Sequence, residues 1–166
     1  MRHTWATLAI LTLTGAMAAV WAQSTSLVIQ VVPEAHITPS SVPLSFNVRN
    51  SGEVVVSEPV PVIAWVRALP GQQIRLTAQI GSLTGPDGIL PVSTVSWTGT
   101  TGRATGGGTA ASCTSGSFTA GSAQPLISGW NQSGIVTCNL SFSLTTDPAW
   151  STGSYSGQVT LQISAQ

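Results

Sequence analysis

The C-terminal stretch Gly153-Ser-Tyr-Ser-Gly-Gln-Val-Thr-Leu-Gln-Ile-Ser164 determines the fold class of this chain. Its odd-numbered positions, such as Tyr155, Val159 and Leu161, are apolar or small, and its even-numbered positions are Ser, Gln or Thr. Successive side chains of a β-strand point to opposite faces of the sheet. This period of two therefore predicts a strand with one buried face and one exposed face.

The same alternation recurs along the chain. The segments that show it are residues 27–31, 42–48, 62–69, 74–80, 92–97 and 136–144. They are separated by turn signals such as Pro86-Asp87-Gly88, and residues 23–166 contain no run with helical periodicity. We predict an all-β protein, an antiparallel immunoglobulin-like two-sheet sandwich of seven or eight strands. A closed barrel is the second choice, because the strands are irregularly spaced.

One stretch, residues 99–121, departs from the alternation. It contains Gly106-Gly107-Gly108 and few side chains that could be buried. We expect a long flexible Gly-rich loop there, with a ligand-binding loop as the alternative.

The N-terminus has the layout of a secretory signal peptide over residues 1–22. Met1-Arg2-His3 provides a positive start, residues 8–19 are largely apolar, and Val20-Trp21-Ala22 precedes a cleavage site before Gln23. A cut after Ala18 is the nearby alternative. An uncleaved anchor or a buried helix is less suitable, because the apolar stretch is shorter than the roughly 20 residues of a bilayer span. We expect a secreted or cell-surface protein, with residues 23–166 as a single domain.

The two cysteines support this compartment. Cys113 and Cys138 are an even number in an exported chain, and we predict a disulfide between them. Together with His36, the single histidine after residue 22, they are too few for a structural zinc site, which needs four ligands. We expect neither a metal nor another cofactor.

The charge excludes two classes of partner. The chain has five basic and five acidic residues and no lysine. Binding to nucleic acid or to an anionic membrane surface requires clustered cations, and the few arginines are scattered. We therefore predict neither nucleic-acid binding nor binding to an anionic membrane surface. We also predict no membrane insertion after signal cleavage, because the most apolar later stretch, residues 59–66, is short and carries two prolines.

Catalytic groups in a recognisable arrangement are also missing from the sequence. Gly153-Ser-Tyr-Ser-Gly157 carries tyrosine where a nucleophile elbow requires serine. His36 lies between prolines 33 and 39, which indicates a surface or inter-strand histidine, and the carboxylates are scattered. An enzyme needs a base, a nucleophile or a metal within mutual reach. We expect a protein without catalytic residues.

The aromatic residues suggest two roles. Trp65 and Trp97 lie on alternating segments, and we expect both to pack in the core. Trp130, Trp150 and Tyr155 lie in or beside turn-rich sequence and are candidates for stacking on sugar rings. For the two tryptophans, we favour covering the end of the sandwich over stacking on sugars.

Two segments carry a family resemblance. Trp150-Ser-Thr-Gly-Ser-Tyr-Ser-Gly-Gln-Val-Thr-Leu-Gln-Ile163 resembles the final strand of bacterial secreted β-sandwich proteins of the fimbrial-subunit and spore-coat-U type. Ile37-Thr-Pro-Ser-Ser-Val-Pro-Leu-Ser-Phe46 is similar to their opening strands. The resemblance implies an exported, non-catalytic, surface or fibre-forming role.

A secreted structural or adhesive protein, as a subunit of an extracellular or surface fibre, is the leading functional hypothesis. In residues 26–32, Leu27, Ile29 and Val31 point one way and could fill a groove between sheets. This segment can be the first strand of its own domain, or a strand donated to another surface subunit. The alternative function is a small carbohydrate-binding module that uses exposed Trp and Tyr side chains on glycans.

Overall fold

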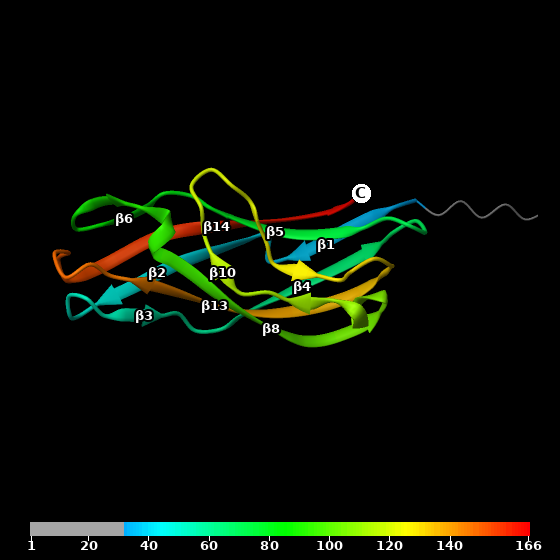
Figure 1. Cartoon of the computed structure of the whole chain (residues 1–166), viewed down its shortest axis with the longest axis horizontal. Helices are drawn as coiled ribbons and strands as arrows, with labels where there is room; N and C mark the ends of the chain where they lie inside the picture. Colours follow the sequence, from blue (N-terminus) through cyan, green and yellow to red (C-terminus); the bar gives the residue numbers. More distant parts are fainter. Residues whose placement is uncertain (1–31) are drawn as a thin grey trace, which may run out of the picture. The chain divides into compact units, whose positions relative to one another are not determined.

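The computed structural model describes residues 32–166. Two six-stranded antiparallel sheets pack against each other, and a two-stranded ribbon accompanies them (Figure 1). The predicted two-sheet sandwich is confirmed. Seven strands have five or more residues, which matches the expected number, but seven further strands of two or three residues were not expected.

The first sheet is built around β13, a strand of 12 residues. Its order is β1 (Glu34–Thr38), β4 (Val60–Arg67), β13 (Gly134–Thr145), β8 (Val95–Gly106) and β10 (Gly116–Ser117). The short strand β3 (Val54–Val56) also pairs with β13, beyond the end of β4. In Figure 1, β13 and β8 lie in the lower layer.

The second sheet is built around β14, the strand formed by the C-terminal alternation. Its order is β11 (Gln124–Pro125), β5 (Ile74–Ile80), β14 (Gly153–Ala165), β6 (Leu83–Gly85) and β7 (Gly88–Leu90). On its other side β14 pairs with β2 (Ser41–Val48). The ribbon consists of β12 (Ile127–Ser128) and β9 (Ser112–Cys113).

The core lies between the two sheets and follows the predicted alternation. Phe46, Phe142 and Leu161 point into it from β2, β13 and β14. Trp97 on β8 is also buried and packs against Phe118 in a tilted arrangement, with 4.8 Å between the ring centroids, as expected for a core tryptophan. Within residues 32–166 the helical structure is limited to two short 3₁₀ turns, and no helix there is long and apolar enough to cross a membrane.

The prediction of a flexible loop over residues 99–121 is wrong for most of this stretch. β8 continues to Gly106, pairs with β13, and is followed by a 3₁₀ turn and the short strands β9 and β10. Apolar alternation is missing from the stretch because glycine and other small residues occupy it. These small residues allow it to pack closely on β13. A Cβ at Gly108 would lie 2.4 Å from the carbonyl oxygen of Ile135, and one at Gly134 would lie 2.5 Å from the Gly108 nitrogen.

Candidate functional site

The predicted disulfide between Cys113 and Cys138 is confirmed. It joins β9 to the centre of β13, with 5.8 Å between the two Cα atoms. No group of three or more His, Cys, Asp or Glu side chains with the geometry of a metal site occurs within residues 32–166. Because Cys138 lies on a core strand, the disulfide attaches the glycine-rich stretch to the core.

The prediction that three aromatic side chains stack on sugar rings is wrong for two of them, Trp130 and Tyr155. Tyr155 is fully buried, and Trp130 is 2% exposed with its indole N–H donating to the Gln132 carbonyl oxygen at 2.7 Å. Both side chains pack in the core, so neither ring has a face open for stacking on a sugar. Trp150 is partly exposed and lies 6.0 Å from the Tyr155 ring. Its role in stacking stays a prediction.

Tyr155 instead anchors two turns. Its hydroxyl lies 2.7 Å from Asp87 Oδ2 and 2.6 Å from the Ser151 carbonyl oxygen. The Ser151 side chain and main chain also donate to the Asp87 carboxylate. Bonds from Ser151 and Tyr155 lower the pKa of Asp87, and burial raises the pKa of Tyr155 to about 12. The single described histidine, His36, lies outside this group, whose hydrogen bonds link the turn at Asp87 to the turn at Ser151.

The raised pKa of Tyr155 predicts a loss of stability in alkali. Unfolded tyrosine ionises near pH 10, whereas folded Tyr155 ionises near 12, so stability present below pH 10 falls progressively as the pH rises from 10 to 12. Urea unfolding between pH 8 and pH 11.5 measures this loss.

The matched variant for this experiment is Tyr155→Phe. The chain has one tyrosine and no lysine, so few other groups titrate in this range. We expect the alkaline loss to disappear in the variant. An identical pH profile in both proteins would assign the loss to another group.

Trp65 lies on the outer face of the first sheet, which corrects its expected place in the core. Its ring is partly exposed beside His36, at 5.5 Å between ring centroids, and the Arg67 guanidinium carbon is 5.5 Å from its centroid. His36 is on the edge strand β1 and contacts Glu34 at 2.7 Å. The residues of β4 that face the core are instead Val62, Ala64 and Val66.

An open seam separates β2 from β3, which belong to different sheets. Gln73 and Gln166 form two main-chain hydrogen bonds with each other. Because hydrogen-bonded pairs alternate along an antiparallel ladder, the main-chain groups of even-numbered residues of β14 point towards β5, and those of odd-numbered residues point towards β2. By the register of β14 with β2, the main-chain groups of Ser45 and Asn47 on β2 then point away from β14. Within residues 32–166, β2 has no strand partner on that side.

The other side of the seam is the free edge of β3. Glu53 and Ser57 bond to the strand that carries β13, so the main-chain groups of Val54 and Val56 point towards the seam. Both valine side chains are exposed, at 59% and 63%. A cavity of about 490 Å³ lies in the seam, lined by β2 and by the chain from Val55 to Val60.

The open edge of β2 has defined ends. Pro43 has no N–H to donate, and the Arg49 N–H already donates to Glu53 Oε1 at 2.6 Å. This bond, followed by one from the Asn50 N–H, lowers the pKa of Glu53 and holds the turn between β2 and β3. The unpaired part of the edge therefore centres on Ser45 and Asn47.

A second cavity opens beside β5, where the adjacent chain leaves the sheet. The Leu126 N–H donates to the Leu76 carbonyl oxygen at 2.8 Å, and the Ile74 N–H donates to the Trp130 carbonyl oxygen at 3.0 Å. Positions two apart on β5 thus meet positions four apart on the adjacent chain, so this chain bulges outward by two residues. Within the bulge, Ile127 pairs with Cys113 of β9.

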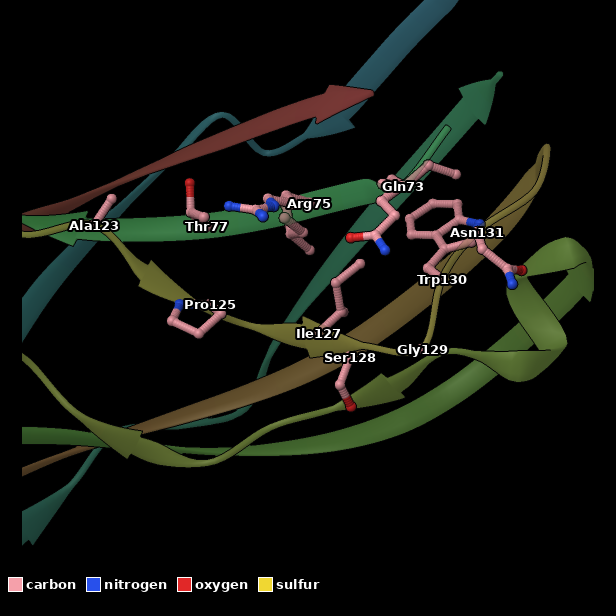
Figure 2. Close-up of a pocket in the computed structure, with 12 residues that line it drawn as sticks. Gln73, Arg75, Thr77, Ala123, Pro125, Ile127, Ser128, Gly129, Trp130 and Asn131 are labelled. Atoms are coloured by element: carbon pink, nitrogen blue, oxygen red, sulfur yellow. The ribbon is translucent and has the colours of Figure 1, made fainter. Parts of the chain in front are cut away.

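The bulge leaves a cavity of about 550 Å³ between β5 and residues 123–131. Figure 2 shows Gln73, Arg75 and Thr77 along β5. Ile127 lies opposite them, and Trp130 lies at the end of the cavity beside Gln73. A Cβ at Gly129, which has φ +78°, would lie 2.6 Å from the Ala110 carbonyl oxygen, so glycine is required at this bend. Sequence reasoning missed this cavity because the bulge depends on pairing between β12 and β9.

The predicted strand-exchange residues Leu27, Ile29 and Val31 lie outside the described residues.

Comparison with family models, with curated proteins and with solved structures finds no significant match to this chain.

Proposed function

We propose that this protein is an exported, non-catalytic structural β-sandwich that assembles into a surface or extracellular fibre by strand addition. The observation that carries the proposal is the open seam between β2 and β3, where two unpaired strand edges face a cavity. Unpaired edges of this kind are where an extended segment of another chain adds to a sheet.

The occupant that we propose is the segment of residues 26–32 from a second copy. Leu27, Ile29 and Val31 provide three aliphatic side chains with the spacing of one strand face. Burying them contributes roughly 5–8 kcal/mol before the cost of ordering the segment. The main-chain groups of Ser45 and Asn47 on the β2 edge supply hydrogen bonds worth about 1 kcal/mol each.

Export is the second part of the proposal. Residues 1–22 have the composition of a signal peptide, and the Cys113–Cys138 disulfide fits an oxidising compartment. The fimbrial-subunit and spore-coat-U resemblance is consistent with such a place at the cell surface.

Proline at the open edge tests strand addition. Ser45→Pro removes one N–H that points into the seam, and we expect assembly of the protein starting at Gln23 to weaken by about fivefold, the equivalent of one hydrogen bond. Ser45→Ala is the matched control, because it loses the hydroxyl but keeps the N–H. Analytical ultracentrifugation over a concentration series measures assembly, and thermal unfolding confirms that both variants fold.

Deletion of residues 23–31 identifies the donor. We expect the shortened protein to fold and to stay monomeric, and a Ser26–Val32 peptide to bind to it. The proposal would be overturned if the undeleted protein starting at Gln23 remains monomeric at every concentration, or if the proline and alanine variants assemble equally. Loss of cooperative unfolding in the shortened protein would show that the segment serves its own domain.

A further inference from the structure

The cavity beside β5 contains polar side chains whose hydrogen-bonding groups are not used within the fold. Gln73, Arg75, Thr77, Ser128 and Asn131 all line it. Among the described residues, none of these five side chains has a hydrogen-bonding partner in the protein, while other polar side chains nearby, such as Gln72 and Thr114, do. The cavity thus offers two amides, two hydroxyls and a guanidinium to a ligand.

The charge of the cavity is positive. Arg75 is its one cationic lining residue, and no carboxylate lines it. Within residues 32–166, the ion pair formed by His36 and Glu34 is the sole salt bridge, so Arg75 has no acidic partner there. An arginine side chain in this position can donate two parallel hydrogen bonds to a carboxylate.

The remainder of the cavity wall is largely apolar. Pro125, Ile127 and the edge of Trp130 lie opposite or beside the polar groups (Figure 2). A volume of about 550 Å³ is within the range of small-molecule sites, roughly 300–1,000 Å³. Apolar walls with a few convergent polar groups are typical of such sites.

We propose that this cavity binds an acidic saccharide, with the carboxylate of a hexuronate unit on the Arg75 guanidinium. The amides of Gln73 and Asn131 and the hydroxyl of Thr77 both donate and accept, as sugar hydroxyls require. The proposal does not depend on strand addition, because β5 and β2 lie on opposite sides of β14.

An extended peptide suits the cavity less well. The edge of β5 is already paired with Gln124 and Pro125, and Leu126 and Trp130 bond to it at the two ends of the bulge. The remaining gap is shorter than the several residues over which a peptide adds to a sheet edge. The free side chains, rather than main-chain groups, therefore provide the recognition.

Binding of trigalacturonate to the protein starting at Gln23 tests the proposal. We expect saturable binding by isothermal titration calorimetry and a shift of the Trp130 indole resonance in the ¹⁵N–¹H spectrum. Arg75→Gln should weaken binding by about tenfold or more, because a charge-assisted hydrogen bond is lost. Arg103→Gln is the matched control: it removes the same charge from an exposed position on β8, outside the cavity.

The neutral trisaccharide of galactose and a short peptide with a free C-terminal carboxylate are the competing probes. We expect the first to bind at least tenfold more weakly than trigalacturonate and the second not to shift the Trp130 resonance. Absence of binding at 10 mM trigalacturonate, equal effects of the two arginine variants, or equal binding of the neutral sugar would overturn the proposal. Tighter, Arg75-dependent binding of the peptide would assign the cavity to a peptide carboxylate instead.

Discussion

Replacing Cys113 and Cys138 together by serine should lower the free energy of unfolding by about 2–5 kcal/mol. The disulfide closes a loop with a sequence separation of 25 residues, and it is attached to the fully buried Cys138 side chain. The three short strands inside this loop, β10, β11 and β12, have two residues each and contribute few ladder hydrogen bonds of their own. Chemical denaturation of the double variant and of the native protein measures the difference.

Reduction of the native protein is the control for this variant. Reduced protein and the double serine variant should have the same free energy of unfolding within about 1 kcal/mol, because both lose the same constraint on the unfolded chain. Equal stability of the oxidised protein and the double variant would show that the loop is held by its packing alone.

Tyr155→Ala should lower the free energy of unfolding by about 3–5 kcal/mol, the usual cost of removing a buried aromatic ring. The ring is fully buried and lies so close to β6 that a Cβ at Gly85 would be 2.0 Å from its Cδ1 atom. The substitution leaves a cavity at this end of the core and also removes the hydroxyl that contacts Asp87 and Ser151. Urea unfolding at pH 7 measures the loss.

Tyr155→Phe separates the two contributions. It keeps the ring and leaves hydrogen-bonding groups of Asp87 and Ser151 without the hydroxyl, at an expected cost of about 1–3 kcal/mol. A phenylalanine variant as unstable as the alanine variant would show that the hydroxyl network, rather than ring packing, stabilises this end of the sandwich.

The sequence predicted those features that depend on local pattern. The alternation from Tyr155 to Ile163 became the central strand β14, because a period of two fits a strand with one buried face. The Cys113–Cys138 pairing followed from having two cysteines in a chain that the sequence predicts to be exported. Trp97 was also placed correctly, since its neighbours on one face of β8 are apolar at the start of that strand.

Other features were determined by tertiary structure alone. In β4, residues on both faces are apolar, so alternation could not tell which face is buried; packing of the sheets chose Val62, Ala64 and Val66 and left Trp65 outside. Residues 99–106 form a strand because β13 supplies their hydrogen bonds, not because their own side chains favour one. The candidate sites also depend on how the sheets assemble. The seam lies where the facing edges of β2 and β3 have no partner strand within residues 32–166, and the second cavity lies where the chain paired with β5 bulges away from it.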